Sequence, residues 1–158
     1  LEYPVTFCVF SWKGSDIKRG SEEQVFFHDP ERNLQLVRDL GPAIDDQHRR
    51  LAMEEKLGEN VRLLYVALTR AKHRCYFVWG GIKGASTYAS SWLFHRPAVA
   101  DPAVVASLEA HFKSLSDEQM LADLQSLSEK SGGAIHLSDL PEAAGEPYQP
   151  PATTGSLK

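Results

Sequence analysis

The chain of 158 residues has few cysteines, no long apolar run and no excess of positive charge. Cys8 and Cys75 lie in apolar segments and are too few for a zinc knuckle, so we expect no disulfide or metal role and interpret both as small buried hydrophobes. No run approaches the roughly 18 apolar residues that span a bilayer, and no signal-peptide pattern is present, so we expect no membrane segment and a cytoplasmic protein. A formal net charge of -4 argues against a self-sufficient nucleic-acid-binding domain.

The composition is that of one ordinary globular domain. Hydrophobic residues make up 42% of the chain and charged residues 24%, and the length suits a single domain with its own core. Charge is uneven, because basic residues gather in segment 62–74 while segment 117–146 is acidic. We interpret the acidic segment as solvated helix surface rather than as a binding site for a partner.

The first half of the chain has a strand, helix, strand order. Residues 3–12 are nearly all apolar, which is typical of a strand buried on both faces at the centre of a parallel sheet, and residues 74–79 predict a second buried strand. Between them, residues 24–27 and 34–38 flank a polar turn and predict a β-hairpin insertion. The order predicts an α/β domain with a parallel sheet.

Helices are predicted from caps and from apolar spacing. Asp45 or Asp46 is expected to cap a helix that runs towards Gly58, which either ends the helix or weakens it. From Leu57 an apolar stripe follows at helical spacing, formed by Val61, Leu64, Tyr65, Leu68 and Ala71. Leu63 and Val66 lie on the opposite side, so we expect this helix to pack between two layers.

The remainder of the chain is expected to be mainly helical. Residues 90–94, 102–115 and 117–129 predict three helices, the last capped by Ser116. Residues 134–137 suggest one last edge strand. From Pro141 onward the composition is rich in Pro, Ala, Gly, Thr and Ser, which is typical of an extended or disordered linker.

Two motifs carry a resemblance to a known family. Segment 61–73, Val-Arg-Leu-Leu-Tyr-Val-Ala-Leu-Thr-Arg-Ala-Lys-His, resembles motif VI of the UvrD-like (superfamily 1) helicases, and segment 1–7, Leu-Glu-Tyr-Pro-Val-Thr-Phe, is similar to the second half of their motif V. Segments 25–30, 34–37 and 72–79 resemble the RecB-type branch, the beta subunit of exodeoxyribonuclease V. The resemblance implies a fragment of the second motor domain.

The resemblance also implies a fold and a domain organisation. We expect a partial RecA-like P-loop NTPase-type α/β domain, with the hairpin as an insertion and a helical segment at its C-terminal end. Residues 1–140 would be the C-terminal part of the helicase RecA-like domain 2A. Residues 141–158 would be a proline-rich linker toward a nuclease domain that the chain lacks.

The resemblance assigns roles to two residues of this sequence. The arginine of the Thr-Arg pair in motif VI is a catalytic arginine finger, which maps to Arg70, and the glutamate of motif V contacts the nucleotide ribose, which maps to Glu2. The other interpretations are a structural salt bridge for Arg70 and an ordinary terminal charge for Glu2. Arg62 is expected to bind either phosphate or the carboxylate of Glu59.

Two neighbours of Arg70 are left outside the catalytic set. Thr69 is expected either to support Arg70 or to cap backbone carbonyls, and Tyr65 is interpreted as a core residue. His28 with Asp29, and His73, have no further ligands at metal-binding spacing, so no metal site is predicted. Trp79 lies in a strand pattern that favours the core, as does Trp12, whereas Trp92 belongs to a predicted helix.

A missing motif limits what the chain does alone. It contains no Gly-x-x-x-x-Gly-Lys-Ser/Thr phosphate loop, so we expect the isolated chain to bind no nucleotide and to be inactive, while the intact enzyme uses ATP and Mg. The resemblance implies that the intact enzyme acts on duplex DNA ends and single strands in recombinational repair, with the gamma and alpha subunits of exodeoxyribonuclease V. Alternatives are an AddA-type or UvrD/Rep-type helicase, or a non-catalytic protein-interaction module that keeps the fold.

Overall fold

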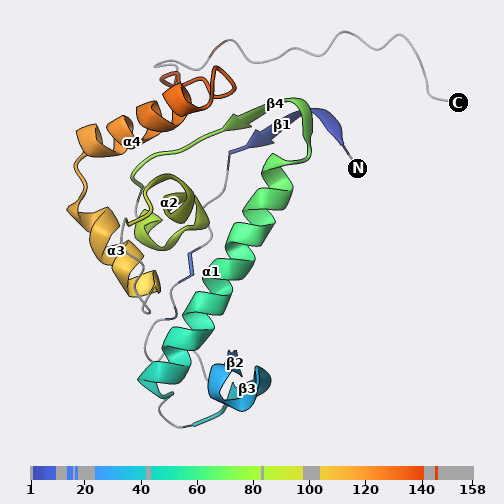
Figure 1. Ribbon diagram of the computed structural model, residues 1–158, viewed down its shortest axis with the longest axis vertical. Helices are drawn as coiled ribbons and strands as arrows, with labels where there is room; N and C mark the ends of the chain where they lie inside the picture. Colours follow the sequence, from blue (N-terminus) through green and yellow to red (C-terminus); the bar gives the residue numbers. More distant parts are fainter. Residues whose placement is uncertain are drawn as a thin grey trace, which may run out of the picture.

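A computed structural model of the chain describes residues 2–9, 14, 15, 17, 24–41, 44–82, 84–97, 104–140 and 145. One long helix, α1, runs the length of the molecule, and the other elements lie along it (Figure 1). In chain order the elements are β1 (Tyr3–Cys8), β2 (Val25–Asp29), the short 3-10 helix η1 (Pro30–Arg32), β3 (Gln35–Asp39), α1 (Asp46–Leu68), β4 (Ala71–Phe77), the short 3-10 helix η2 (Ala85–Thr87), α2 (Ala89–Phe94), α3 (Val104–Ser114) and α4 (Asp117–Lys130). The predicted α/β class, with a small parallel sheet and flanking helices, is confirmed.

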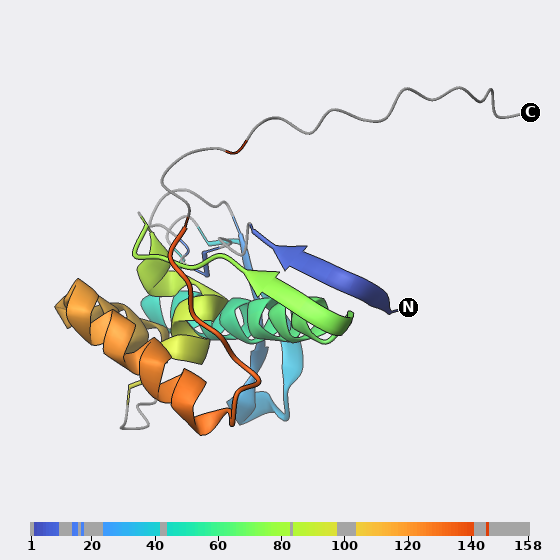
Figure 2. The same cartoon turned by 90° about the horizontal axis from the view of Figure 1, so that it is seen from above.

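Strands β1 and β4 pair in parallel beside the C-terminal end of α1, as the strand, helix, strand order predicts (Figures 1 and 2). The prediction that both strands are buried on two faces is wrong, because Val5 and Phe7 of β1 and Tyr76 of β4 are exposed. Within the described residues this sheet has two strands, and helices contact it on one face. Strand β4 also begins earlier than predicted, at Ala71, which therefore belongs to the sheet and not to the helical stripe.

Helix α1 begins where its N-cap predicts. The Asp45 carboxylate accepts hydrogen bonds from the backbone N–H groups of Gln47 and His48, so Asp45 is the cap and Asp46 the first helical residue. The helix then continues through Gly58 to Leu68, 23 residues in all, so Gly58 does not end it. The predicted helix before Gly58 and the apolar stripe after it therefore form one continuous helix.

The predicted hairpin is confirmed and lies against the first half of α1. Strands β2 and β3 pair antiparallel, and Asn33 at the turn has a left-handed backbone with φ 54°. Val25 and Phe27 point into a small core with Ala52 of α1. At the other end of the hairpin, Asp39 accepts a hydrogen bond from the Gly41 N–H and contacts the His48 ring, and these contacts join β3 to the start of α1.

The three C-terminal helices match their predicted positions, and Ser116 with Gln119 forms a capping box at α4. The predicted edge strand at residues 134–137 is wrong. Instead the Ile135 N–H donates to Ser131 Oγ, and the Ile135 carbonyl accepts from Ser128 Oγ. Serines at the end of α4 thus satisfy backbone groups that a strand would need for pairing. Apart from Gly145, the predicted linker from Pro141 onward lies outside the described residues, as does Trp12.

The buried side chains of the described residues form three small hydrophobic cores instead of one large core, and α1 contributes to two of them. The first joins α1 to the hairpin, the second joins Leu57 of α1 to Val105 and Leu108 of α3, and the third joins Tyr88 to Phe112 of α3. Trp79 and Trp92 are half-buried and pack against the third and second cores. None of the described helices is long and apolar enough to cross a membrane.

Candidate nucleotide-binding site

The end of α1 is fixed by the threonine that precedes the predicted catalytic arginine. Thr69 caps the helix, since its hydroxyl donates to the Tyr65 carbonyl at 2.8 Å and its N–H donates to the same oxygen at 3.0 Å. This confirms the interpretation of Thr69 as a cap for backbone carbonyls. The chain then turns sharply, and Arg70 is the last residue before β4.

Arg70 lies exposed in this turn. Its backbone is held on both sides, because its N–H donates to the Ala67 carbonyl and its own carbonyl accepts from the Tyr3 N–H at 2.9 Å. The guanidinium forms no hydrogen bond or ion pair with any other residue that the structure describes. The structural salt bridge, which was the other interpretation of Arg70, is therefore not found in the described part of the chain.

Glu2 is brought to the same edge of the sheet as Arg70. It directly precedes Tyr3, whose N–H bonds to the Arg70 carbonyl, and Tyr3 pairs with Ala71 in the parallel sheet. Glu2 is exposed. A parallel sheet sets the beginnings of neighbouring strands side by side. Glu2 and Arg70, which are far apart in sequence, therefore directly precede neighbouring strands.

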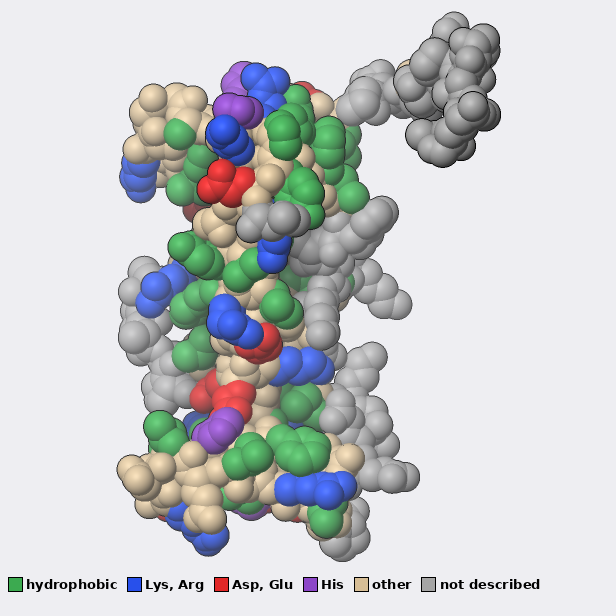
Figure 3. All heavy atoms as spheres, turned by 90° about the vertical axis from the view of Figure 1, so that its right-hand side faces the viewer, with side chains coloured by type: hydrophobic (Ala, Val, Ile, Leu, Met, Phe, Trp, Pro, Cys, Tyr) green, Lys and Arg blue, Asp and Glu red, His purple; other side chains and the backbone are tan. Residues whose placement is uncertain are grey.

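Basic residues continue from the turn into β4. Lys72, His73 and Arg74 are exposed, and Figure 3 shows Lys, Arg and His side chains gathered at one end of the molecule beside hydrophobic side chains. The Arg74 guanidinium donates to the Tyr76 hydroxyl at 3.1 Å, and this hydrogen bond raises the pKa of Arg74. The edge that carries Arg70 is therefore locally cationic although the chain as a whole is acidic.

The second arginine of the motif has a different environment. Arg62 forms a two-pronged ion pair with Glu59, at 3.0 Å from Nε and 2.9 Å from Nη2, and this pair raises the pKa of Arg62. Of the two roles predicted for Arg62, the structure has the helical pair with Glu59. Tyr65 was predicted to be a core residue, and this is wrong: 66% of its surface is exposed.

The exposed side of α1 explains the error at Tyr65. Leu63 and Val66 are exposed as well, whereas Leu57 and Leu64 on the other side are buried. The expectation that α1 packs between two layers is therefore wrong for the described residues, which cover one side of the helix. Apolar spacing alone does not distinguish a covered side from an uncovered one.

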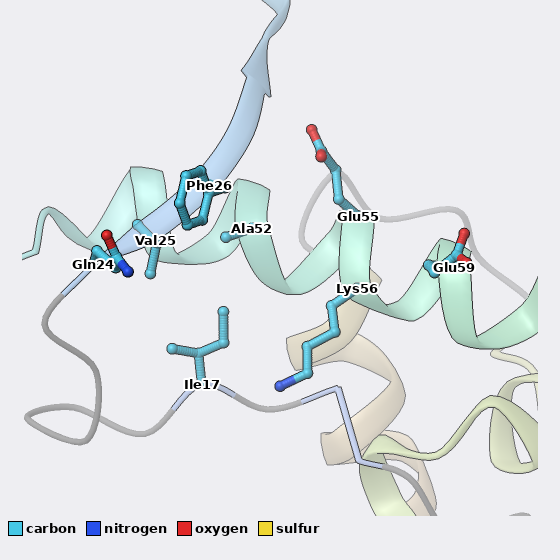
Figure 4. A pocket seen from close by; sticks show the side chains of 8 residues that line it. All are labelled: Ile17, Gln24, Val25, Phe26, Ala52, Glu55, Lys56 and Glu59. Atoms are coloured by element: carbon cyan, nitrogen blue, oxygen red, sulfur yellow. The ribbon is translucent and has the colours of Figure 1, made fainter. Parts of the chain in front are cut away.

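A hollow of about 460 Å³ between the hairpin and α1 was not anticipated from the sequence (Figure 4). Glu55, Lys56 and Glu59 of α1 line it, together with Phe26 of β2. Its carboxylates are engaged, because Glu55 contacts His28 and Glu59 contacts Arg62. At 1.5 Å per residue, Glu59 in the wall of the hollow lies about 14 Å along α1 from Leu68 at its end. The hollow is therefore separate from the end of the sheet at which Arg70 lies.

Two curated proteins are similar to parts of this chain. The A subunit of the ATP-dependent helicase/nuclease of Carboxydothermus hydrogenoformans is 31% identical over 111 residues, which cover 64% of this chain and 9% of that protein. The "RecBCD enzyme subunit RecB" of Escherichia coli is 39% identical over 75 residues, which cover 48% of this chain and 6% of that protein. The chain therefore spans less than a tenth of the length of either relative.

No family model matches the chain. No solved structure is significantly similar to it. The two curated similarities are both to helicase/nuclease subunits, and they confirm the resemblance of the chain to RecB-type proteins.

Proposed function

We propose that residues 1–140 belong to the second RecA-like motor domain of a RecB-type DNA helicase and nuclease, and that residues 141–158 lead toward a nuclease domain. One observation carries the proposal. The Tyr3 N–H donates to the Arg70 carbonyl, so the segments that resemble motifs V and VI begin neighbouring strands. Two motifs that serve one nucleotide must meet in space, and these two do.

Arg70 is proposed to act as the arginine finger on ATP that another domain holds. Its guanidinium is permanently charged and planar, and it offers paired N–H donors to the oxygens of the γ-phosphoryl group, over which negative charge spreads during transfer. Because Arg70 has no ion pair among the described residues, it reaches a phosphate without first breaking one. Glu2 is proposed to accept a hydrogen bond from the ribose.

The residues present fit one side of a nucleotide and not the whole of it. A cation for the γ-phosphate and a carboxylate for the ribose are available, but the sequence has no phosphate loop to hold the triphosphate. In the intact enzyme, another domain would hold ATP together with Mg, which would neutralise part of the phosphate charge. For this reason the chain alone is proposed to have no ATPase activity.

The intact enzyme is proposed to couple ATP hydrolysis to the unwinding and degradation of duplex DNA ends in recombinational repair, with gamma and alpha subunits as partners. Support comes from the names of the two relatives, which are subunits of an ATP-dependent helicase/nuclease and of the RecBCD enzyme. An AddA-type enzyme is the nearest alternative, because the similarity to the helicase/nuclease of Carboxydothermus hydrogenoformans covers more of this chain.

The test is ATP hydrolysis by the full-length parent protein with single-stranded DNA, in the wild type and in Arg70→Ala. We expect kcat to fall by about 10³ or more, the range for loss of an arginine finger, while the affinity for a fluorescent ATP analogue stays nearly unchanged. Arg70→Lys should recover little, because an ammonium group lacks the planar fork.

Arg62→Ala is the matched control, since Arg62 belongs to the same motif but is paired with Glu59. It should leave kcat close to that of the wild type. A change confined to KM in Arg70→Ala would indicate ground-state binding instead of catalysis. Unchanged turnover would reject the finger and favour the non-catalytic interaction module.

A further inference from the structure

The two cysteines of the chain meet on the side of the β1–β4 sheet that faces the helices, called here the inner face. They are 67 residues apart in sequence, but Cys8 ends β1, Cys75 lies in β4, and their Sγ atoms are 3.9 Å apart. Both residues are half-buried, so solvent still reaches them. Each cysteine is isolated along the sequence, and the parallel pairing of the two strands makes them neighbours.

The spacing of the two thiols does not suit a disulfide. In the register of the sheet Thr6 is opposite Cys75 and Cys8 is opposite Phe77, so the two cysteines are diagonal neighbours. Diagonal neighbours have Cα atoms about 7–8 Å apart, whereas a disulfide usually joins Cα atoms no more than about 6.8 Å apart. A third atom between the two sulfurs spans the distance without moving the strands.

The sulfur positions suit a metal ion. An ion about 2.3 Å from each sulfur, the usual distance to a thiolate, would have the two sulfurs at an angle of about 116°, between the tetrahedral and trigonal values. Among the described residues, no group of three or more His, Cys, Asp or Glu side chains is placed to hold a metal. Zinc takes four ligands and is poorly served here, whereas monovalent copper is selected by soft thiolates and accepts fewer ligands.

A threonine beside the two thiols has an unused hydroxyl. Thr6 lies two residues before Cys8, on the same face of β1, and directly opposite Cys75. Its Oγ1 atom is buried and has no hydrogen-bond partner among the described residues. A buried hydroxyl without a partner is costly, and a thiolate sulfur is an acceptor that would satisfy it. Deprotonation of the thiols by a bound ion would supply that acceptor.

We propose that Cys8 and Cys75 form a two-thiolate site for monovalent copper, with the Thr6 hydroxyl donating a hydrogen bond to one of the sulfurs. One Cu⁺ ion forms two Cu–S bonds, and the two thiol protons pass to solvent with no change of oxidation state. The ion would join the strands that begin in segments 1–7 and 61–73. The inference is independent of the proposed function, because it uses neither Arg70 nor Glu2.

Titration of the reduced 158-residue chain with monovalent copper, under nitrogen and in competition with the chelator bicinchoninate, tests the proposal. We expect one copper ion per chain. Cys8→Ser and Cys75→Ser should each weaken binding by at least about a hundredfold, because loss of an outer partner alone costs about 10- to 100-fold. Thr6→Val keeps the branched shape but removes the hydroxyl, and should weaken binding by about tenfold.

His73→Gln is the matched control, because an imidazole also binds copper and His73 lies on β4 two residues before Cys75. It should leave the affinity unchanged. Circular dichroism checks that each variant is folded. Thermal unfolding of the wild-type chain needs no variant: copper should raise the unfolding temperature, because an ion that binds the folded state stabilises it.

Four outcomes would overturn the proposal. The first is that the wild-type chain binds no copper or is not stabilised by it, and the second is that both serine variants bind copper as tightly as the wild type. The third is loss of binding in His73→Gln, which would place the ion on the imidazole. The fourth is one copper ion for two chains with dimers in sedimentation, which would mean that the ion joins chains instead of strands.

Discussion

Two arginines of one motif have opposite environments in this chain. Arg62 is held by Glu59 through two hydrogen bonds, whereas Arg70 is exposed with no partner in the described residues. An exposed ion pair adds little stability, so Arg62 contributes mainly a local contact on the helix. The unpaired guanidinium is the one that remains available to a phosphate, which is why the proposed chemistry rests on Arg70.

A thiol gives a residue-scale prediction with a pH dependence. Burial, and secondarily the Cys8 thiol, raises the pKa of Cys75 to about 11, so Cys75 stays a neutral thiol at pH 8. In Cys8→Ser, where burial alone remains, Cys75 should react with iodoacetamide more slowly in the folded chain than in urea, because the thiolate is the nucleophile and burial disfavours it. The rate should rise with pH as the thiolate fraction of Cys75 grows.

Mass spectrometry of the alkylated chain measures that rate. Removal of Cys8 takes away both contributions of the neighbouring thiol, so the folded rate in the single-cysteine chain reports the burial of Cys75. Equal rates in the folded and unfolded chains would show that burial does not protect this thiol.

At the scale of elements, α1 is the helix against which most of the other elements pack. It contacts the hairpin, β1, β4, α2 and α3, and it carries the chain from the Asp45 cap to the Thr69 cap. Its weakest position is Gly58, which is exposed and has no atom within 4 Å of the place that a Cβ would occupy. Glycine in a helix interior costs conformational entropy without a packing benefit here.

Gly58→Ala should therefore stabilise the chain by about 0.5–1 kcal/mol in urea unfolding. Gly132→Ala is the matched control after α4, where φ is 62°, and it should destabilise because a side chain is strained in that conformation. A loss of stability in Gly58→Ala would indicate that the exposed side of α1 is covered by something in solution.

At the scale of the whole molecule, a buried histidine links α2, α4 and the segment after β4 through hydrogen bonds. The His95 side chain is fully buried at the end of α2. Its Nδ1 lies 2.8 Å from the Asp123 carboxylate of α4, and its Nε2 accepts a hydrogen bond from the Trp79 indole at 3.1 Å. An indole N–H only donates, so Nδ1 carries the ring proton and donates it to Asp123.

His95→Ala should destabilise the chain by about 3 kcal/mol, because it leaves a cavity and removes two hydrogen bonds. Asp123→Asn should cost less, since an amide oxygen still accepts from Nδ1. Urea unfolding followed by tryptophan fluorescence measures both, and Trp79 reports the local change. Equal stability of His95→Ala and the wild type would show that α4 is held without this contact.

Local features of this protein follow from its sequence. The Ser116 cap, a cap of α1 at Asp45 or Asp46, the hairpin and the parallel order of β1 and β4 are all predicted correctly. Each of them depends on residues close together or on element order. The resemblance in segments 1–7 and 61–73 likewise names Glu2 and Arg70 without any structure.

The sequence by itself thus determined the α/β class, the starts of α1 and α4 and the resemblance to RecB-type helicase/nuclease subunits. Only the tertiary structure decided that Tyr65 and Phe7 are exposed and that His95 meets Asp123. The physical reason is that apolar spacing shows which residues share a face of a helix or strand. Whether another element covers that face depends on segments far away in the chain, and the spacing pattern carries no information about them.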